Sequence, residues 1–247
     1  MMTSTEIRNR QNERIDTGFH PGTRADALVI LGHGLTGNKD RPQLVALATG
    51  LAARGWPCLR ISYPGNGGSE GRFEDCCVTK EIGDLQSVLE MVPNDVKVAY
   101  AGHSMGGAVG VLTAARDMRI FTLISLAGMT HTAAFVQREF SDVVPGAGLM
   151  WDEEEHPLTE KFVDDLKSIE STLHAAEAVI QPWLFIHGDA DDLVPIQDSR
   201  DAYQAATCEK SFLEIPGGDH AFEEKDYPKI IDAVDFWLAT HIGPRPA

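Results

Sequence analysis

The sequence feature that most constrains the fold is the run Gly102-His103-Ser104-Met105-Gly106. It follows residues 96–101, a short apolar run that predicts a buried strand, and it precedes residues 107–115, whose small side chains predict a helix. A serine in a Gly-x-Ser-x-Gly pattern at a strand-to-helix turn is held in a strained conformation with its Oγ exposed. The run therefore predicts an α/β sheet with Ser104 as a candidate nucleophile. The alternative is a glycine-rich turn in which Ser104 only caps a helix.

Strand and helix patterns alternate over most of the 247 residues. This alternation predicts a single α/β domain, residues 1–247, with a mostly parallel sheet of about eight strands and helices on both faces. The predicted strands are a hairpin of residues 7–10 and 14–17, followed by 27–31, 58–62, 96–101, 121–126, 183–186 and 211–215. The predicted helices are residues 42–54, 78–92, 107–115 and 230–240.

A long connection separates two of the predicted strands. Residues 129–181, from Met129 to Gln181, exceed by far the length that a crossover between strands needs. We therefore expect a short lid insertion in this segment.

Composition and charge exclude several classes of partner. The net charge of −16 argues against nucleic acid and against anionic membrane surfaces. The histidines and cysteines have no metal-ligand spacing, so we expect no metal and no cofactor. No apolar run approaches the roughly 20 residues of a membrane span, and residues 1–6 contain no apolar signal-peptide core. We expect a cytoplasmic protein with reduced thiols that acts on a small molecule, and the oligomeric state is not predicted.

A serine nucleophile needs a base, and the base needs an acid that orients it. Residues 188–195 follow a predicted strand and offer three carboxylates, Asp189, Asp191 and Asp192, among which composition alone does not choose. His220 follows the last predicted strand. The order serine, acid, histidine along the chain is typical of one α/β class of hydrolases.

These motifs together resemble the α/β-hydrolase fold serine esterases. Gly188-x-x-Asp191-x-x-Val194-Pro195 resembles the acid loop of that family, and the match selects Asp191. Gly218-Asp219-His220-x-Phe222 resembles its histidine loop, and residues 33–39 resemble its oxyanion loop. Residues 71–75, ahead of the helix that contains Lys80-Glu81-Ile82, are similar to the feruloyl or cinnamoyl esterase branch.

The resemblance implies a role for each residue. Ser104 would be the nucleophile, His220 the general base and acid, and Asp191 the carboxylate that holds the histidine tautomer. The backbone N–H groups of Leu35 and Met105 would form the oxyanion hole. The implied function is the hydrolysis of carboxylic esters with short to medium neutral acyl or aryl groups. A peptidase, a thioesterase or a lipase would use the same triad.

Two other classes of function compete with hydrolysis. Gly32-x-Gly34-x-x-Gly37 also fits the dinucleotide fingerprint of an oxidoreductase. Against this reading, residues 38–41 intervene before the next helix, and the following strand does not end in Asp or Glu. The remaining alternative is a non-catalytic ligand-binding protein on a hydrolase scaffold, because a fold does not fix a function.

The expected lid is strongly acidic. Residues 129–181 contain eleven acidic and three basic side chains, a net charge of −8. Such a run can be a solvated surface, or its field can repel anionic substrates. Apolar residues are interleaved with the charges, and we expect most of them to pack on the core and a few to line a substrate pocket. They are Met129, Phe135, Phe140, Val143, Val144, Leu149, Met150 and Trp151.

Overall fold

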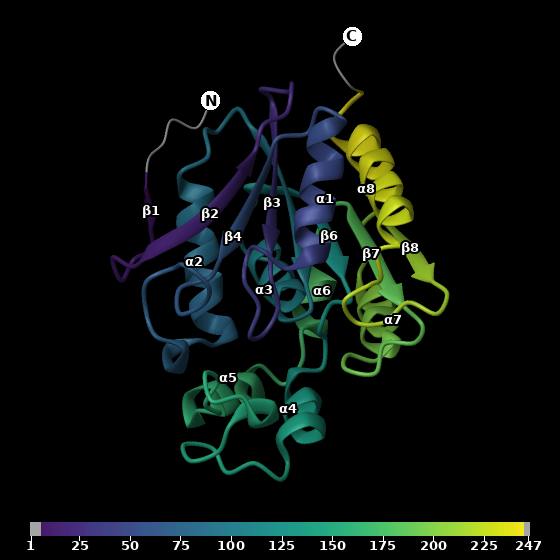
Figure 1. Ribbon diagram of the computed structural model, residues 1–247. Coiled ribbons are helices and arrows are strands. Elements are labelled where there is room, and N and C mark those ends of the chain that lie inside the picture. The colour runs from purple at the N-terminus through teal and green to yellow at the C-terminus, as the bar shows by residue number, and fades with distance from the viewer. Residues whose placement is uncertain (1–5, 245–247) are drawn as a thin grey trace.

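The computed structural model describes residues 6–244 and contains an eight-stranded sheet with helices on both faces (Figure 1). Its strands are β1 (Ile7–Arg8), β2 (Arg14–His20), β3 (Ala27–Gly32), β4 (Cys58–Ser62), β5 (Lys97–His103), β6 (Ile120–Leu126), β7 (Trp183–Gly188) and β8 (Lys210–Ile215). Its α-helices are α1 (Pro42–Ala53), α2 (Val78–Glu90), α3 (Met105–Ala114), α4 (Thr132–Phe140), α5 (Glu160–Ile169), α6 (Leu173–Ala178), α7 (Ile196–Ala205) and α8 (Tyr227–His241). Two 3-10 turns are η1 (Phe73–Asp75) and η2 (Met150–Asp152). The expectation that residues 1–6 contain no signal-peptide core concerns mainly residues 1–5, which lie outside the described residues.

The sheet has the strand order β1-β2-β4-β3-β5-β6-β7-β8. β1 pairs with β2 and β2 with β4 in antiparallel fashion, whereas every pairing from β4 to β8 is parallel. The predicted hairpin and the predicted mostly parallel sheet are therefore confirmed. Because parallel strands share one direction, the loops after β3, β5, β7 and β8 all leave the same edge of the sheet.

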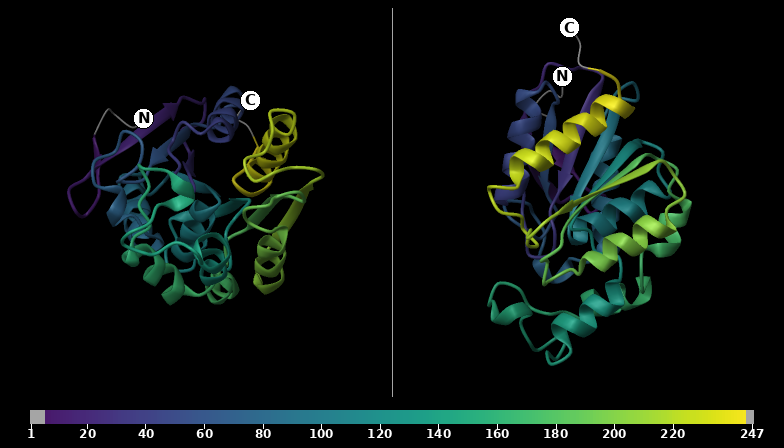
Figure 2. Two further views of the ribbon diagram at one scale, coloured as in Figure 1. Left: turned by 60° about the horizontal axis from the view of Figure 1, so that its bottom comes forward. Right: turned by 90° about the vertical axis from the view of Figure 1, so that its right-hand side faces the viewer.

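Each face of the sheet carries its own hydrophobic core. On β3, Leu28 and Ile30 pack into one core while Val29 and Leu31 pack into the other, as the period of two along a strand requires. The helices α1 and α8 cover one face, and α2, α3, α6 and α7 cover the other (Figures 1 and 2). A sheet buried on both faces explains why its strands have almost continuous apolar runs.

The four predicted helices are present as α1, α2, α3 and α8, with ends shifted by a few residues. Helix α7 lies outside the predicted set. Its buried residues are Asp198, Ser199 and Ala202, so two of the three side chains on its inward face are polar. A polar inward face removes the signal on which sequence-based helix prediction depends.

The connection between β6 and β7 contains α4, η2, α5 and α6. In Figure 1, α4 and α5 lie beyond the arrowheads of the parallel strands, at the edge where the four loops leave the sheet. Phe140 packs against Phe135, Trp151 and Phe162 and gives this insertion a small aromatic core. Of the apolar residues singled out in the sequence, Val144 and Trp151 are exposed.

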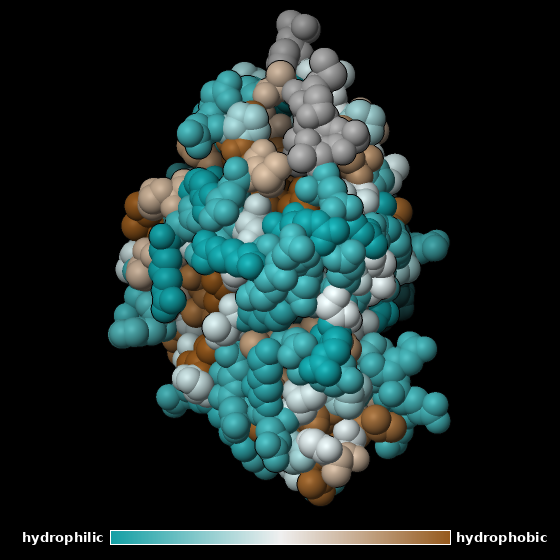
Figure 3. Space-filling model, turned by 90° about the vertical axis from the view of Figure 1, so that its left-hand side faces the viewer, coloured by the Kyte–Doolittle hydropathy of each residue, from teal (hydrophilic) through white to brown (hydrophobic). Residues whose placement is uncertain are grey.

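The insertion contacts the rest of the chain on two sides. On one side His156 packs against Phe73 with ring centroids 4.7 Å apart and the rings tilted by 58°, and Asp165 accepts the Thr79 N–H at 3.0 Å. On the other side the Arg138 guanidinium donates to the Leu193 carbonyl at 2.5 Å. Figure 3 shows that hydrophilic residues dominate the face with β1, α2 and α5, with scattered hydrophobic side chains among them. No helix among residues 6–244 is long and apolar enough to cross a membrane.

Candidate active site

Ser104 occupies the turn between β5 and α3 with φ 55° and ψ −121°. This backbone conformation is strained for a residue with a side chain, as a nucleophile elbow requires. The turn is tight enough to demand glycine nearby, because a Cβ on Gly102 would lie 2.2 Å from the Gly106 carbonyl oxygen. The alternative of a simple capping serine loses support, since the Ser104 side chain makes no cap hydrogen bond.

The loop after β3 lies directly against Ser104. A Cβ on Gly34 would be 2.6 Å from the Ser104 Cβ and 3.0 Å from its Oγ, so only glycine permits this approach. His33 shapes the loop, because its Nδ1–H donates to the Gly34 carbonyl at 2.8 Å and its Nε2 accepts the Tyr63 N–H at 2.9 Å. In a dinucleotide-binding fingerprint the third glycine begins the helix. Here Gly37 lies in the loop well before α1 begins at Pro42, so the structure argues against that alternative.

The two residues expected to form the oxyanion hole lie in the segments next to Ser104. Met105 is the first residue of α3, where the N–H has no intrahelical partner and the helix dipole favours negative charge. Leu35 follows Gly34 in the loop beside the Ser104 Oγ. Among the turn, loop and cap hydrogen bonds of residues 6–244, neither the Leu35 N–H nor the Met105 N–H donates to a backbone carbonyl.

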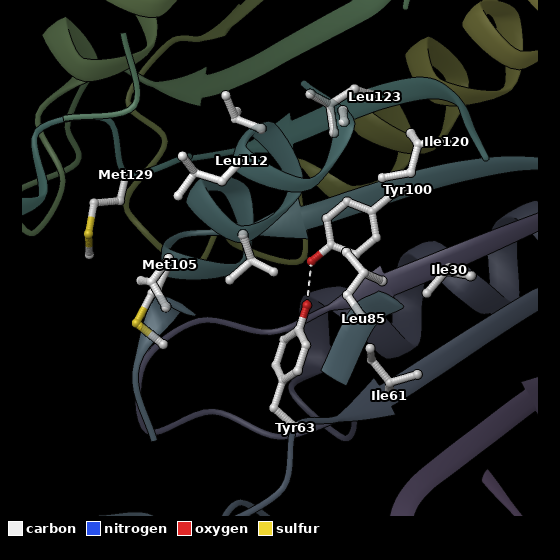
Figure 4. Close-up of a cluster of buried hydrophobic side chains, with 14 of the residues drawn as sticks. Ile30, Ile61, Tyr63, Leu85, Tyr100, Met105, Leu112, Ile120, Leu123 and Met129 are labelled. Atoms are coloured by element: carbon white, nitrogen blue, oxygen red, sulfur yellow. Dashed lines mark hydrogen bonds between the residues drawn. The ribbon is translucent and has the colours of Figure 1, made fainter. Parts of the chain in front are cut away.

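A buried pair of tyrosines, Tyr63 and Tyr100, connects the elbow to the hydrophobic core (Figure 4). The Tyr100 hydroxyl donates to the Gly106 carbonyl at 3.0 Å, so the 2.7 Å contact between the two hydroxyls has Tyr63 as its donor. Both tyrosines are fully buried. The chain of hydrogen bonds connects the end of β4 to the start of α3 and holds the elbow on the core.

The structure brings Asp191 and His220 together at the same edge of the sheet. The His220 Nδ1–H donates to Asp191 Oδ2 at 2.8 Å, which leaves the His220 Nε2 with a free lone pair. The Asp191 side chain is fully buried, and that of His220 is 15% exposed. His220 also lies beside the elbow, since the His103 Nε2–H donates to the His220 carbonyl at 2.8 Å.

Asp191 is held as a carboxylate. Burial alone would raise the pKa of this carboxyl, but hydrogen bonds from His187 and His220 and from the Val194 N–H outweigh burial and hold its pKa below the ordinary value. The other two carboxylates of this loop are exposed. Asp189 accepts the Gly217 N–H at 2.5 Å, and Asp192 lies at the surface. Among the three, Asp191 alone contacts His220.

Sequence reasoning did not identify two residues near the triad. His187, on β7, donates its Nε2–H to Asp191, and Asp198, on α7, accepts the N–H groups of Thr130 and His131 at 2.7 and 2.9 Å. Asp198 thereby fixes the point where the chain enters the insertion. The signal for His187 was present as a polar residue in the otherwise apolar run of residues 183–188.

Comparison with known proteins identifies the fold and the family of this chain. The fold matches solved α/β hydrolases, among them Est1E from Butyrivibrio proteoclasticus with ferulic acid bound, with a TM-score of 0.82, 22% identity and coverage of 97% of this chain and 99% of the other. The sequence model described as "Serine aminopeptidase, S33" matches residues 23–151. The chain therefore belongs to the serine aminopeptidase S33 family of α/β hydrolases. The matched range contains Ser104 but neither Asp191 nor His220, so these two rest on the geometry.

Two relatives have similar sequences over most of their length. The uncharacterised protein YfhR of Salmonella typhimurium is 27% identical over 218 residues, which cover 83% of this chain and 68% of the relative. A monoacylglycerol lipase of Mycolicibacterium smegmatis is 24% identical over 257 residues, which cover 90% of this chain and 91% of the lipase.

Two buried histidines make stability depend on pH. Burial lowers the pKa of His33 to about 4 and that of His103 to about 3, from 6.5 for each side chain. Unfolding exposes both side chains, so below about pH 6.5 they bind protons in the unfolded chain but stay neutral in the folded chain until the pH approaches their lowered pKa values. We expect the contribution of these two histidines to the free energy of unfolding to be fully retained above pH 6.5 and to fall toward pH 4, each by up to about 1.4 kcal/mol per pH unit.

Urea unfolding at several pH values between 7 and 4.5 checks this expectation. The variant His103→Gln keeps an amide donor for the His220 carbonyl and removes the titration, so its slope of stability against pH is shallower than that of the wild type. His174→Gln is the matched control, because His174 is fully exposed. Equal slopes for His103→Gln and the wild type would contradict the assignment.

Proposed function

We propose that this hydrolase cleaves carboxylic esters with short to medium neutral acyl or aryl groups, through an acyl-enzyme intermediate on Ser104. The observation that carries the proposal is the 2.8 Å hydrogen bond between Asp191 and His220, beside a serine in strained elbow geometry. A binding protein on the same scaffold has no need for a buried carboxylate that fixes an imidazole beside the elbow. The Est1E structure with ferulic acid and the monoacylglycerol lipase support an ester as substrate.

Each step assigns one role to one group of the candidate site. The His220 Nε2 takes the proton of the Ser104 hydroxyl as Oγ attacks the ester carbonyl carbon. The N–H groups of Leu35 and Met105 stabilise the oxyanion, each contributing roughly 3 kcal/mol. His220 then gives the proton to the leaving alcohol as the C–O bond breaks and the acyl-Ser104 ester remains. Water, deprotonated by His220, hydrolyses that ester and restores the serine.

A peptidase is the second candidate, because the family description names a serine aminopeptidase. The two are separated by kcat/KM for p-nitrophenyl esters of increasing acyl length and for methyl ferulate, measured beside amino-acid p-nitroanilides and a thioester of matched acyl length. We expect the highest values for esters with short to medium chains or an aryl group. Faster cleavage of the anilides would overturn the ester proposal in favour of the peptidase, and a faster thioester would make the protein a thioesterase.

The β6–β7 insertion acts as a lid within a single domain, over residues 129–181. It lies at the edge of the sheet that carries Ser104, Asp191 and His220, the edge where ligands bind in open α/β sheets. It also rests on the acid loop through Arg138 and on the α2 side through His156. A cytoplasmic location and the absence of nucleic-acid or membrane partners stay predictions of the sequence.

The lid charge favours neutral over anionic esters. We expect a higher kcat/KM for a neutral ester than for its carboxylate isostere, and a smaller gap at high salt, because the Debye length falls from about 30 Å at 0.01 M to about 3 Å at 1 M. The exposed pair Glu154 and Glu155 allows a direct test. The double variant Glu154→Gln, Glu155→Gln reduces the difference in kcat/KM between the two esters at low salt. Asp95→Asn, at the opposite edge of the sheet, leaves this difference unchanged. If salt does not change the difference in kcat/KM, the acidic residues of the lid form a solvated surface and do not select the substrate.

A further inference from the structure

His187 is a histidine for which the proposed chemistry has no step. It is the penultimate residue of β7, and its side chain is fully buried. The ring lies between the acid loop and α7. Its Nδ1 contacts the Ser199 Oγ at 2.7 Å, and its Nε2 contacts Asp191 Oδ2 at 3.1 Å and the Val194 carbonyl oxygen at 2.9 Å.

These partners fix the tautomer of His187. A carbonyl oxygen and a carboxylate only accept hydrogen bonds, so the ring proton is on Nε2. The Nδ1 lone pair then accepts the Ser199 hydroxyl proton. Both nitrogens of the buried ring thus have hydrogen-bond partners, and Ser199 on α7 holds the ring on its Nδ1 side.

The consequence falls on Asp191. Its Oδ1 accepts the N–H groups of Leu193 and Val194 at 3.0 and 2.8 Å, and its Oδ2 accepts one imidazole N–H from His187 and one from His220. Four donors leave the carboxylate no freedom to rotate. Two of the four donors are side chains. Of these, His187 is fully buried, whereas His220 is partly exposed.

We propose that His187 is a positioning residue for the triad: its Nε2–H holds Asp191 Oδ2 in line with the Nδ1–H of His220. The inference rests on the proposed ester hydrolysis and adds to it a second imidazole that acts only through the carboxylate. Without that donor, Asp191 Oδ2 keeps only the N–H of His220, so the carboxylate can turn and the ring of His220 is no longer held in one orientation. An error of about 1 Å in the position of a catalytic group costs on the order of a hundredfold in rate.

Two amide substitutions separate this role from simple packing. Glutamine is the longer amide and places its NH₂ near the position of the imidazole Nε2, so His187→Gln keeps a donor for Asp191. Asparagine ends near the position of Nδ1, so His187→Asn keeps a partner for Ser199 and loses the donor to Asp191. We expect kcat to fall about 10- to 100-fold in His187→Asn with KM within about twofold of the wild type, and to recover most of the wild-type value in His187→Gln.

Equal values of kcat in His187→Asn and the wild type, or equal losses in both variants, would overturn the inference. If His187→Asn fails to fold, Ser199→Ala takes its place. It removes the hydrogen bond that holds the ring on its Nδ1 side, so the Nε2–H shifts relative to Asp191 Oδ2, and kcat falls severalfold at unchanged KM. Full activity of Ser199→Ala would then overturn the inference.

A spectroscopic measurement separates failure of this inference from failure of the proposed function. The proton between His220 Nδ1 and Asp191 gives a downfield NMR signal that does not depend on any substrate. We expect His187→Asn to shift or broaden that signal and His187→Gln to preserve it. If the wild type hydrolyses no ester, the proposed function fails, whereas an unchanged signal in His187→Asn contradicts the positioning role alone.

Discussion

Ser104→Ala is expected to abolish ester hydrolysis, with a loss in kcat of at least about a thousandfold, while the fold survives. The acyl-enzyme needs the serine Oγ, and no other described serine lies on an elbow beside a paired acid and base. The loss of one oxygen leaves the backbone hydrogen bonds of the turn in place, including that of the Ser104 N–H to the Leu126 carbonyl at 2.9 Å. Steady-state kinetics with the best p-nitrophenyl ester, together with thermal unfolding, measures both parts of the expectation.

Ser211→Ala is the matched control for this substitution. Ser211 is exposed and lies at the start of β8, at the edge of the sheet opposite the candidate site. We expect wild-type kinetics from it. Residual hydrolysis by Ser104→Ala near the wild-type rate would exclude Ser104 as the nucleophile.

The second large effect concerns the acid and the base. His220→Ala loses at least about a thousandfold in kcat, because no other group takes the serine proton. Asp191→Asn loses somewhat less. One carboxylate oxygen becomes an NH₂ group, which must face either the two backbone N–H groups or the two imidazole N–H groups, so the tautomer of His220 is no longer fixed. The measurement is kcat for each purified variant with the same ester.

Asp189→Asn and Asp192→Asn are the controls within the same loop. Each changes one carboxylate to an amide, as Asp191→Asn does, but neither residue contacts His220. We expect a much smaller loss from either of them. A larger loss from Asp189→Asn or Asp192→Asn than from Asp191→Asn would show that the wrong carboxylate had been chosen.

The sequence predicts those parts of the fold whose signals are local. The apolar runs of β3 to β8 and the helices α1, α2, α3 and α8 carry hydrophobic patterns that burial imposes. Helix α7 is different, because its buried face contains Asp198 and Ser199, which bind the insertion and His187 rather than hydrophobic neighbours. A pattern of apolar residues cannot report a face that is buried through hydrogen bonds.

The candidate site divides in the same way. Ser104, Asp191 and His220 were identified because each stands in a short motif after a strand, and the parallel sheet brings the ends of those strands to one edge. His187 and Asp198 were not, because their roles depend on which loops meet in space. The strand order places β7 next to β8, and this adjacency puts His187 and His220 on the same carboxylate oxygen.

The most direct test of the account is covalent labelling of the purified protein with an alkyl fluorophosphonate, followed by peptide mass spectrometry. The reagent phosphonylates an activated serine, with the proton taken up by the base and fluoride leaving. The account predicts one label per chain, on Ser104, formed in step with the loss of esterase activity and absent from Ser104→Ala. A label on another residue, or full esterase activity in a protein that acquires no label, would contradict the account.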